Sequence, residues 1–124
     1  MTQVGGEQVV ERAGVPVLVV GADGPVISGT QDALDVIGSA FSRADVVAIP
    51  VSRLAEQFFQ LRTGLAGEIM QKFTNYRIRL AVVGDISAQV AASSALRDLV
   101  FESNRGSQIW FVPTIEDLDA YLVP

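Results

Sequence analysis

The fold of this chain is decided by one stretch, FFQLRTGLAGEIMQKFTNYRIRLAVVGD, at residues 58–85. Within it Leu65, Ile69 and Phe73 recur every fourth residue, which gives a helix one apolar face. The run RLAVVG at residues 79–84 follows closely and is apolar almost throughout, which is typical of a central strand covered on both sides. A helix that leads directly into a buried strand is a building block of parallel α/β sheets. The sequence therefore predicts an α/β domain arranged around this stretch.

The other strands and helices are predicted from the same periodicities on either side. We expect strands at residues 8–12, 15–20, 45–50, 79–84 and 108–112. We expect helices that begin at residues 28–32, 63, 93–94 and 114, the first three ending near residues 42–44, 75–76 and 104–105. Residues 88–92 are predicted as a connection, and residues 51–62 suit either a loop with a helical turn or an early start of the second helix.

The resulting order is β-β-α-β-α-β-α-β-α. Strands that alternate with helices pair in parallel through right-handed crossovers, whereas the opening hairpin pairs antiparallel. The prediction is therefore a mixed, mostly parallel five-stranded sheet with four helices. The 124 residues are expected to form a single domain with one core, in which residues 1–6 are frayed.

The composition excludes several classes of function. The chain has no cysteine and no histidine, which removes zinc fingers, thiol nucleophiles and Ser-His-Asp catalysis, so we expect no enzyme, no metal and no cofactor. Its formal net charge is −5 and its nine basic residues are scattered, which argues against a nucleic-acid partner. The start lacks a signal-peptide pattern and no apolar run approaches the ~18 residues that span a bilayer, so we expect a cytoplasmic protein without membrane contact.

The element order, together with the segment that runs from the third strand to Thr63 and Gly64, resembles the STAS fold over residues 8–122. This fold is named for sulfate transporters and anti-sigma-factor antagonists. In STAS antagonists a hydroxyl at the start of the second helix is phosphorylated by a partner kinase, and the surrounding surface binds that partner. The resemblance implies that Thr63 is this hydroxyl. Here LRTG, residues 61–64, stands where the family carries Asp-Ser-Ser-Gly, so the acidic residue is missing and Arg62 directly precedes the hydroxyl.

A second resemblance is more specific in its wording. The stretches LRTGLAGEIMQKFTNYRIRLAVVGD, SALRDLVFESNRG and IWFVP resemble a family of small bacterial proteins that share a domain of unknown function. This resemblance implies a bacterial protein and brings no activity with it.

Five residues are candidates for a switch or interaction surface. Thr63 could simply cap the second helix, which is worth ~1 kcal/mol, or it could carry a phosphate favoured by the helix N-terminus and by Arg62. Gly64 could let a partner backbone approach or let the helix pack tightly. Phe58, with Phe59, is an apolar contact if one of the two rings is exposed, and both are core residues if neither is. Arg53 is assigned to the same surface.

Three residues are candidates for a ligand rim. Asp85 and Ser87 follow the central strand, on the side where open α/β sheets bind ligands. Ser52 is expected on the same rim. The competing interpretation of Asp85 is a turn in which its carboxylate accepts nearby N–H groups.

The leading interpretation is a regulatory, protein-interaction module with a STAS-like fold. Its partner would be another protein or a second copy of the chain, as in a homodimer. The alternative is a small-molecule or anion-binding domain, or a weak enzyme, in which Arg53, Arg62, Glu68 and Asp85 converge on one pocket.

Overall fold

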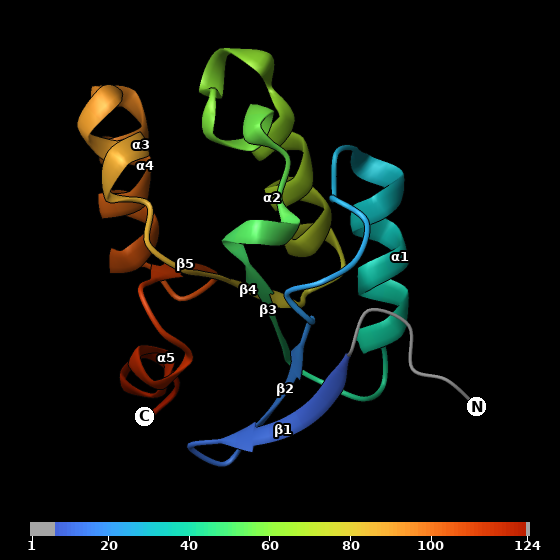
Figure 1. Ribbon diagram of the computed structural model, residues 1–124. Helices are drawn as coiled ribbons and strands as arrows, with labels where there is room; N and C mark the ends of the chain where they lie inside the picture. The colour runs from blue at the N-terminus through green and yellow to red at the C-terminus, as the bar shows by residue number, and fades with distance from the viewer. Residues whose placement is uncertain (1–6, 124) are drawn as a thin grey trace.

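The computed structural model describes residues 7–123 (Figure 1). The strands are β1 (Gln8–Arg12), β2 (Val15–Val19), β3 (Val46–Pro50), β4 (Arg79–Val83) and β5 (Ile109–Val112). The helices are α1 (Thr30–Ala40), α2 (Leu65–Asn75), α3 (Ser87–Ala92), α4 (Ser94–Arg105) and α5 (Ile115–Leu122). None of the helices in the described part of the chain combines the length and the apolar composition that crossing a bilayer requires. The prediction that residues 1–6 are frayed lies outside the described residues.

The five strands form one sheet in the order β1-β2-β3-β4-β5. β1 pairs antiparallel with β2, and every other pair is parallel. The predicted fold class, a mixed and mostly parallel five-stranded α/β sheet, is confirmed. Each right-handed crossover from β2 onward places the next strand beside the previous one in the same direction across the sheet, so the connecting helices α1, α2 and α4 lie on one face. Figure 1 shows α5 on the other face.

Two boundaries differ from the sequence prediction. The chain has a fifth helix, because residues 87–92 form the short α3 instead of a plain connection: the Asp85 carboxylate accepts the N–H of Ser87 and starts a turn of small helix-forming residues. The second helix begins at Leu65 with Gly64 as its N-cap, so the prediction that Thr63 is the N-cap is wrong. Gly64 has φ +82°, a left-handed conformation that interrupts the helical path between Thr63 and α2.

The segment between β3 and α2 is neither an open loop nor an early part of α2. It folds into three short 3-10 helices, η2 (Val51–Arg53), η3 (Glu56–Phe59) and η4 (Leu61–Thr63). These turns are tied to the loop before α1, since the N–H of Ile27 donates to the carbonyl of Arg53 and the N–H of Ala55 donates to the carbonyl of Ile27. The segment is therefore a defined wall that stands above the carboxyl end of β3.

Alternate residues of the strands enter two different apolar clusters, as the two-residue period of a strand requires. On the three-helix face Val47 and Leu80 pack with Phe58 and Ile69. On the opposite face Trp110 packs with Leu118 of α5, in a smaller cluster. Both faces of the central strands are covered, which explains their continuous apolar sequence.

The smaller cluster is closed by an ion pair between the two ends of the chain. Arg12, at the end of β1, donates from Nε to one carboxylate oxygen of Asp119 at 2.6 Å and from Nη2 to the other at 3.0 Å. This two-pronged contact holds the β1–β2 hairpin against α5. The hydrogen bond from Arg12 lowers the pKa of Asp119, and the same bond raises the pKa of Arg12.

Candidate functional site

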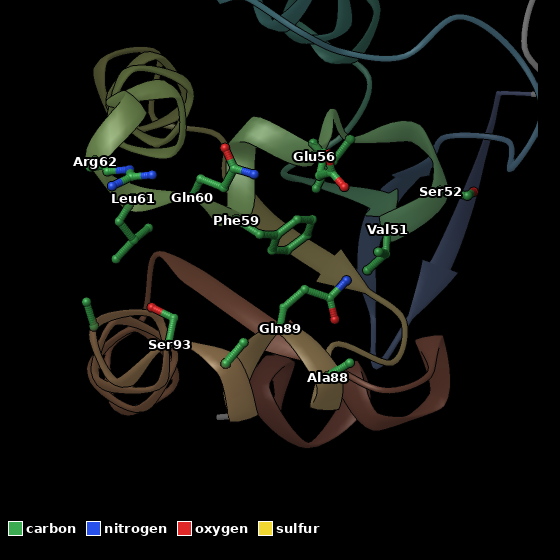
Figure 2. A pocket seen from close by; sticks show the side chains of 13 residues that line it. Val51, Ser52, Glu56, Phe59, Gln60, Leu61, Arg62, Ala88, Gln89 and Ser93 are labelled. Carbon is green, nitrogen blue, oxygen red and sulfur yellow. The ribbon is translucent and has the colours of Figure 1, made fainter.

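A groove of about 960 Å³ lies between the 3-10 segment and the α3–α4 turn. One wall follows β3 and the other follows β4, so the carboxyl ends of two adjacent parallel strands open beneath it. Figure 2 shows the side chains of both walls. The residues that line the groove are Val51, Ser52, Leu54, Glu56, Phe59, Gln60, Leu61, Arg62, Ala88, Gln89, Ala92, Ser93 and Ala95.

The middle of the groove is apolar. Phe59 and Leu61 come from the 3-10 wall, and Ala88 and Ala92 come from the opposite wall. Phe59 lies at 8% exposure, and Figure 2 shows its ring reaching toward Gln89 across the groove. Small alanine side chains on one wall leave room for the side chains of another molecule.

The polar side chains of the groove keep most of their hydrogen-bonding capacity. Glu56, Gln60, Arg62 and Gln89 make no side-chain hydrogen bond or ion pair to any residue in the range 7–123. Figure 2 shows Arg62 at one end of the groove and Glu56 nearer the other. The groove therefore presents opposite charges toward its two ends and uncommitted polar groups along its rim.

Two serines of the groove have structural roles. The hydroxyl of Ser52 donates to the carbonyl of Ala22 at 3.1 Å and fastens the 3-10 wall to the loop before α1. The hydroxyl oxygen of Ser93 accepts the N–H of Leu96 at 3.1 Å and caps α4.

Thr63 stands at the exposed end of the 3-10 wall, next to Arg62. Its hydroxyl lies 2.8 Å from the carbonyl oxygens of Gln57 and Gln60, and its oxygen accepts the N–H of Leu65 at 3.3 Å. A hydroxyl has one proton to donate, so the two carbonyl groups share it. Thr63 thus satisfies an N–H at the start of α2, as predicted, although it stands outside the helix, and it also holds the wall of the groove in shape.

Phe58 and Phe59 have different environments. Phe58 is fully buried and meets Phe59 edge-on, with ring centroids 5.1 Å apart. The interpretation of both rings as core residues therefore applies, and Phe59 also borders the groove.

Arg53 lies inside the protein instead of on the interaction surface. Its side chain is 8% exposed, donates from Nε to the carbonyl of Pro25 at 2.7 Å, and donates from Nη1 to the carbonyls of Gly21 and Asp23 at 2.9 and 3.1 Å. Gly24 packs against the guanidinium so closely that a Cβ there would lie 2.9 Å from Cζ of Arg53. The loop before α1 is wrapped around this cation.

The predicted ligand rim is divided between two places. Ser52 lines the groove, whereas Asp85 and Ser87 line a second hollow of about 660 Å³ between α4 and α5. Asp85 accepts the backbone N–H of Ser87 at 2.9 Å, and this bond, followed by one from the Ser87 hydroxyl, lowers the pKa of Asp85. Asp85 therefore has the geometry of the competing interpretation, a turn in which its carboxylate accepts a nearby N–H.

The other polar groups of the second hollow are likewise engaged. The Asn104 side chain donates from Nδ2 to the carbonyl of Phe111 at 3.0 Å and accepts the N–H of Phe111 at 2.7 Å. The Asp117 carboxylate accepts both the N–H and the hydroxyl of Thr114, in a capping box at the start of α5. Sequence reasoning assigned Asn104 only to the end of a helix, because no local pattern indicates that its amide reaches a strand.

The alternative function required four charged side chains to meet in one pocket. Arg53 is buried in the loop before α1, Arg62 borders the groove, and Asp85 borders the second hollow. Glu68 is an exposed residue of α2 that lines neither hollow. The structure does not bring these residues together.

Comparison with known families identifies the chain. Residues 12–122 match the family described as domain of unknown function DUF4180. The chain belongs to the DUF4180 family. No curated protein and no solved structure matches this DUF4180 chain. The predicted resemblance to a domain-of-unknown-function family is confirmed, and the likeness to STAS domains stays a prediction.

Proposed function

We propose that this DUF4180 domain is a non-catalytic regulatory module that binds a segment of a partner protein in the groove between the 3-10 wall and the α3–α4 turn. One observation carries the proposal: the groove joins an apolar middle to four polar side chains, those of Glu56, Gln60, Arg62 and Gln89, that have no partner among residues 7–123, whereas its two serines are engaged by the fold. Protein interfaces have this anatomy, an apolar centre within a polar rim. The groove volume also suits several side chains of a bound segment.

The charges at the two ends of the groove define the partner. Arg62 can pair with a carboxylate, and Glu56 can pair with an amine or a guanidinium. The partner segment would therefore place apolar side chains over Phe59 and the alanine wall, with an acidic residue at one end and a basic residue at the other. Such paired charges fix the direction in which the segment lies.

The proposal assigns no catalysis to the domain. Three groups in the described part of the chain have clearly shifted pKa values, namely Arg12, Asp85 and Asp119. Each shift is caused first by a hydrogen bond that holds the fold together. Arg12 and Asp119 line neither the groove nor the second hollow, and Asp85 borders the second hollow and not the groove.

We further propose that phosphorylation of Thr63 switches the groove. The STAS resemblance supports this assignment, as does the exposure of Thr63 beside Arg62. A phosphate ester at Oγ1 has no proton to share with the carbonyls of Gln57 and Gln60, so it would release both contacts. It would also add about two negative charges next to Arg62 and the N-terminus of α2. The 3-10 wall would then change shape and charge together.

The switch is tested by incubating the protein with ATP and lysate of the source organism and mapping phosphate by mass spectrometry. We expect phosphate on Thr63 in the wild type and none in Thr63→Val. Thr63→Ser is the matched control, since it keeps the hydroxyl and should still be modified. Failure to detect phosphate at residue 63 across growth conditions would contradict the switch and leave the groove proposal standing.

The groove is tested by site-specific photo-cross-linking. A benzoylphenylalanine introduced at position 92 points into the groove, and the same residue at position 120 points into the second hollow. Both positions are exposed alanines, so both replacements should fold. We expect one protein to cross-link from position 92 and not from position 120. Cross-linking of the same protein only from position 120 would contradict the assignment.

A further inference from the structure

The two edges of the sheet are protected to different degrees. At β5 the Asn104 side chain occupies both outward-facing backbone groups of Phe111, and Pro113 follows the strand directly without an N–H to offer. Side-chain cover and proline are common means by which proteins prevent an edge strand from pairing with another chain. The β5 edge is closed in this way.

The β1 edge carries no such cover within the described residues. β1 and β2 are joined by a two-residue turn, Ala13 and Gly14, both with positive φ. The residues that flank such a turn pair with each other through their backbone, so along β1 every second residue faces β2 and the residues between face outward. The hydrogen bonds of β2 agree with this alternation. The carbonyl of Pro16, the partner of Glu11 in the hairpin, accepts the N–H of Asp45 on the side of β2 that faces β3, so the backbone of Pro16 faces away from β1. Val9 and Glu11 therefore direct their N–H and C=O groups away from the sheet.

The side chains around this edge are acidic and apolar. Val9 pairs with Leu18, whose side chain enters the three-helix cluster, so Val9 and Glu11 point to the three-helix face. Val9 is 37% exposed on that face. A hollow of about 300 Å³ between Glu7, the loop before α1 and α1 has three acids in its lining, Glu7, Asp32 and Asp35, together with Arg53 and apolar residues.

No cation from residues 7–123 forms an ion pair with these acids. The two ion pairs in the described part of the chain are Arg12 with Asp119 and Arg105 with Glu102. Arg53 borders the hollow, but its guanidinium is directed to the carbonyls of the loop before α1. Among residues 7–123, the β1 edge thus offers outward backbone groups without a partner, next to acidic side chains that form no ion pair.

We propose that β1 is a docking edge for an extended, basic segment of another protein, which adds to the sheet as a sixth strand. Backbone hydrogen bonds to Val9 and Glu11 would hold the segment. Lysine or arginine at alternate positions of the segment would lie along the face that carries Glu7 and Glu11. A second copy of β1 fits poorly, because antiparallel pairing of Val9 with Val9 sets Glu7 of one chain opposite Glu11 of the other, and pairing of Glu11 with Glu11 also sets like charges opposite each other.

The first test uses a short synthetic peptide that alternates lysine with threonine and valine. Its binding is measured by calorimetry, and protection of the Val9 and Glu11 amides is measured by hydrogen exchange. Val9→Pro removes the outward N–H and leaves the β1–β2 hydrogen bonds in place, so we expect binding to weaken about tenfold or more. Val9→Ala keeps the N–H and should weaken binding less than about threefold. Equal affinities of the two variants would overturn the proposal.

A second measurement does not depend on the folding of Val9→Pro. N-methylation of alternate peptide residues removes the N–H groups that would pair with β1, and this peptide should not bind. Glu11→Gln should weaken the unmethylated peptide several-fold and flatten its salt dependence, whereas the distant Glu102→Gln should change neither. A peptide with glutamate in place of lysine should bind more weakly, and equal affinity of the two peptides would overturn the proposal. A dimer of the wild-type protein in analytical ultracentrifugation that is lost in Val9→Pro would also overturn it, because a second copy would then occupy the edge.

Discussion

The groove and the second hollow both lie at the carboxyl end of the parallel strands and contain similar residue types, but their polar side chains differ in hydrogen bonding. In the second hollow, Asp85, Asn104 and Asp117 all accept or donate hydrogen bonds that hold turns, an edge strand and a helix start. In the groove, the side chains of Glu56, Arg62 and Gln89 form no hydrogen bond or ion pair with any residue in the range 7–123. A concave surface is a candidate for binding when its polar groups are not already required by the fold.

The topology explains the difference. The second hollow lies where the chain passes from α4 on one face, through β5, to α5 on the other. That passage leaves a strand edge and a helix start that need partners, and the local side chains supply them. The backbone groups of the two groove walls are bonded to the loop before α1, to Thr63 and to Ser93, so Glu56, Arg62 and Gln89 are not needed by the fold and are available to another molecule.

The largest expected difference between engaged and available groups is between two arginines. Arg53→Met should lower the free energy of unfolding by about 3 kcal/mol, because three bonds from a buried cation to carbonyl groups are lost. Arg62→Met, on the exposed groove rim, should change it by less than about 0.5 kcal/mol. Urea unfolding of both variants measures the contrast. Similar losses in the two variants would show that Arg62 also belongs to the framework.

The same contrast is expected between the two amides. Asn104→Ala should cost about 2 kcal/mol, since the N–H and carbonyl of Phe111 both lose their partner at the sheet edge. Gln89→Ala in the groove should be within about 0.5 kcal/mol of wild type. If Asn104→Ala were equally neutral, the β5 edge would not need the amide, and the second hollow would become the better candidate for binding.

Thr63 lies between these extremes, because it is exposed and yet bonded. Thr63→Val keeps the shape and removes the hydroxyl, which should cost about 1 kcal/mol through the lost contacts to the 3-10 wall and to Leu65. Thr63→Ser should recover most of that loss. A thermal melt of the two variants distinguishes them, and a Val variant as stable as wild type would remove the structural role of the hydroxyl.

The smallest effect is expected from the ion pair that closes the far face of the sheet. The pKa of Asp119 is lowered in the folded protein by the hydrogen bond from Arg12, so its stabilising contribution is complete above the unfolded carboxyl pKa of about 3.9. That contribution is lost as the pH falls through the lower folded pKa. When the pH is lowered from about 5 to about 2, the free energy of unfolding of Asp119→Asn should therefore fall less than that of the wild type. A stability profile of Asp119→Asn that runs parallel to that of the wild type would contradict this role of the ion pair.

The sequence was sufficient for the parts of the molecule that depend on local pattern. The apolar period of residues 65–73 and the buried run of β4 predicted the central unit, and the helix expected to begin at residue 114 is α5, with Thr114 as its N-cap. The short α3 was missed because six residues of small side chains carry no apolar period. The second helix begins at Leu65 and not at residue 63, because the left-handed conformation of Gly64 has no signature in the sequence that distinguishes it from a helical glycine.

The candidate site was less predictable because its walls are distant in sequence. Residues 51–62 and 88–95 meet only after β3 and β4 pair, so neither segment indicates the groove alone. The burial of Arg53 depends on which carbonyl groups the loop before α1 presents to it. Thr63 and Arg62 could be proposed in advance because they stand at a helix start, where local chemistry is informative.

The most direct test of the account compares two tryptophans that fill the two hollows. Ala92→Trp fills the groove and Ala120→Trp fills the second hollow, and both positions are exposed, so both variants should melt like the wild type. The affinity of each variant is then measured for the partner that cross-links from position 92. We predict that Ala92→Trp weakens binding at least about tenfold, a loss of ~1.4 kcal/mol, and that Ala120→Trp leaves it unchanged. Unaltered binding by Ala92→Trp, or loss of binding by Ala120→Trp alone, would contradict the assignment of the groove.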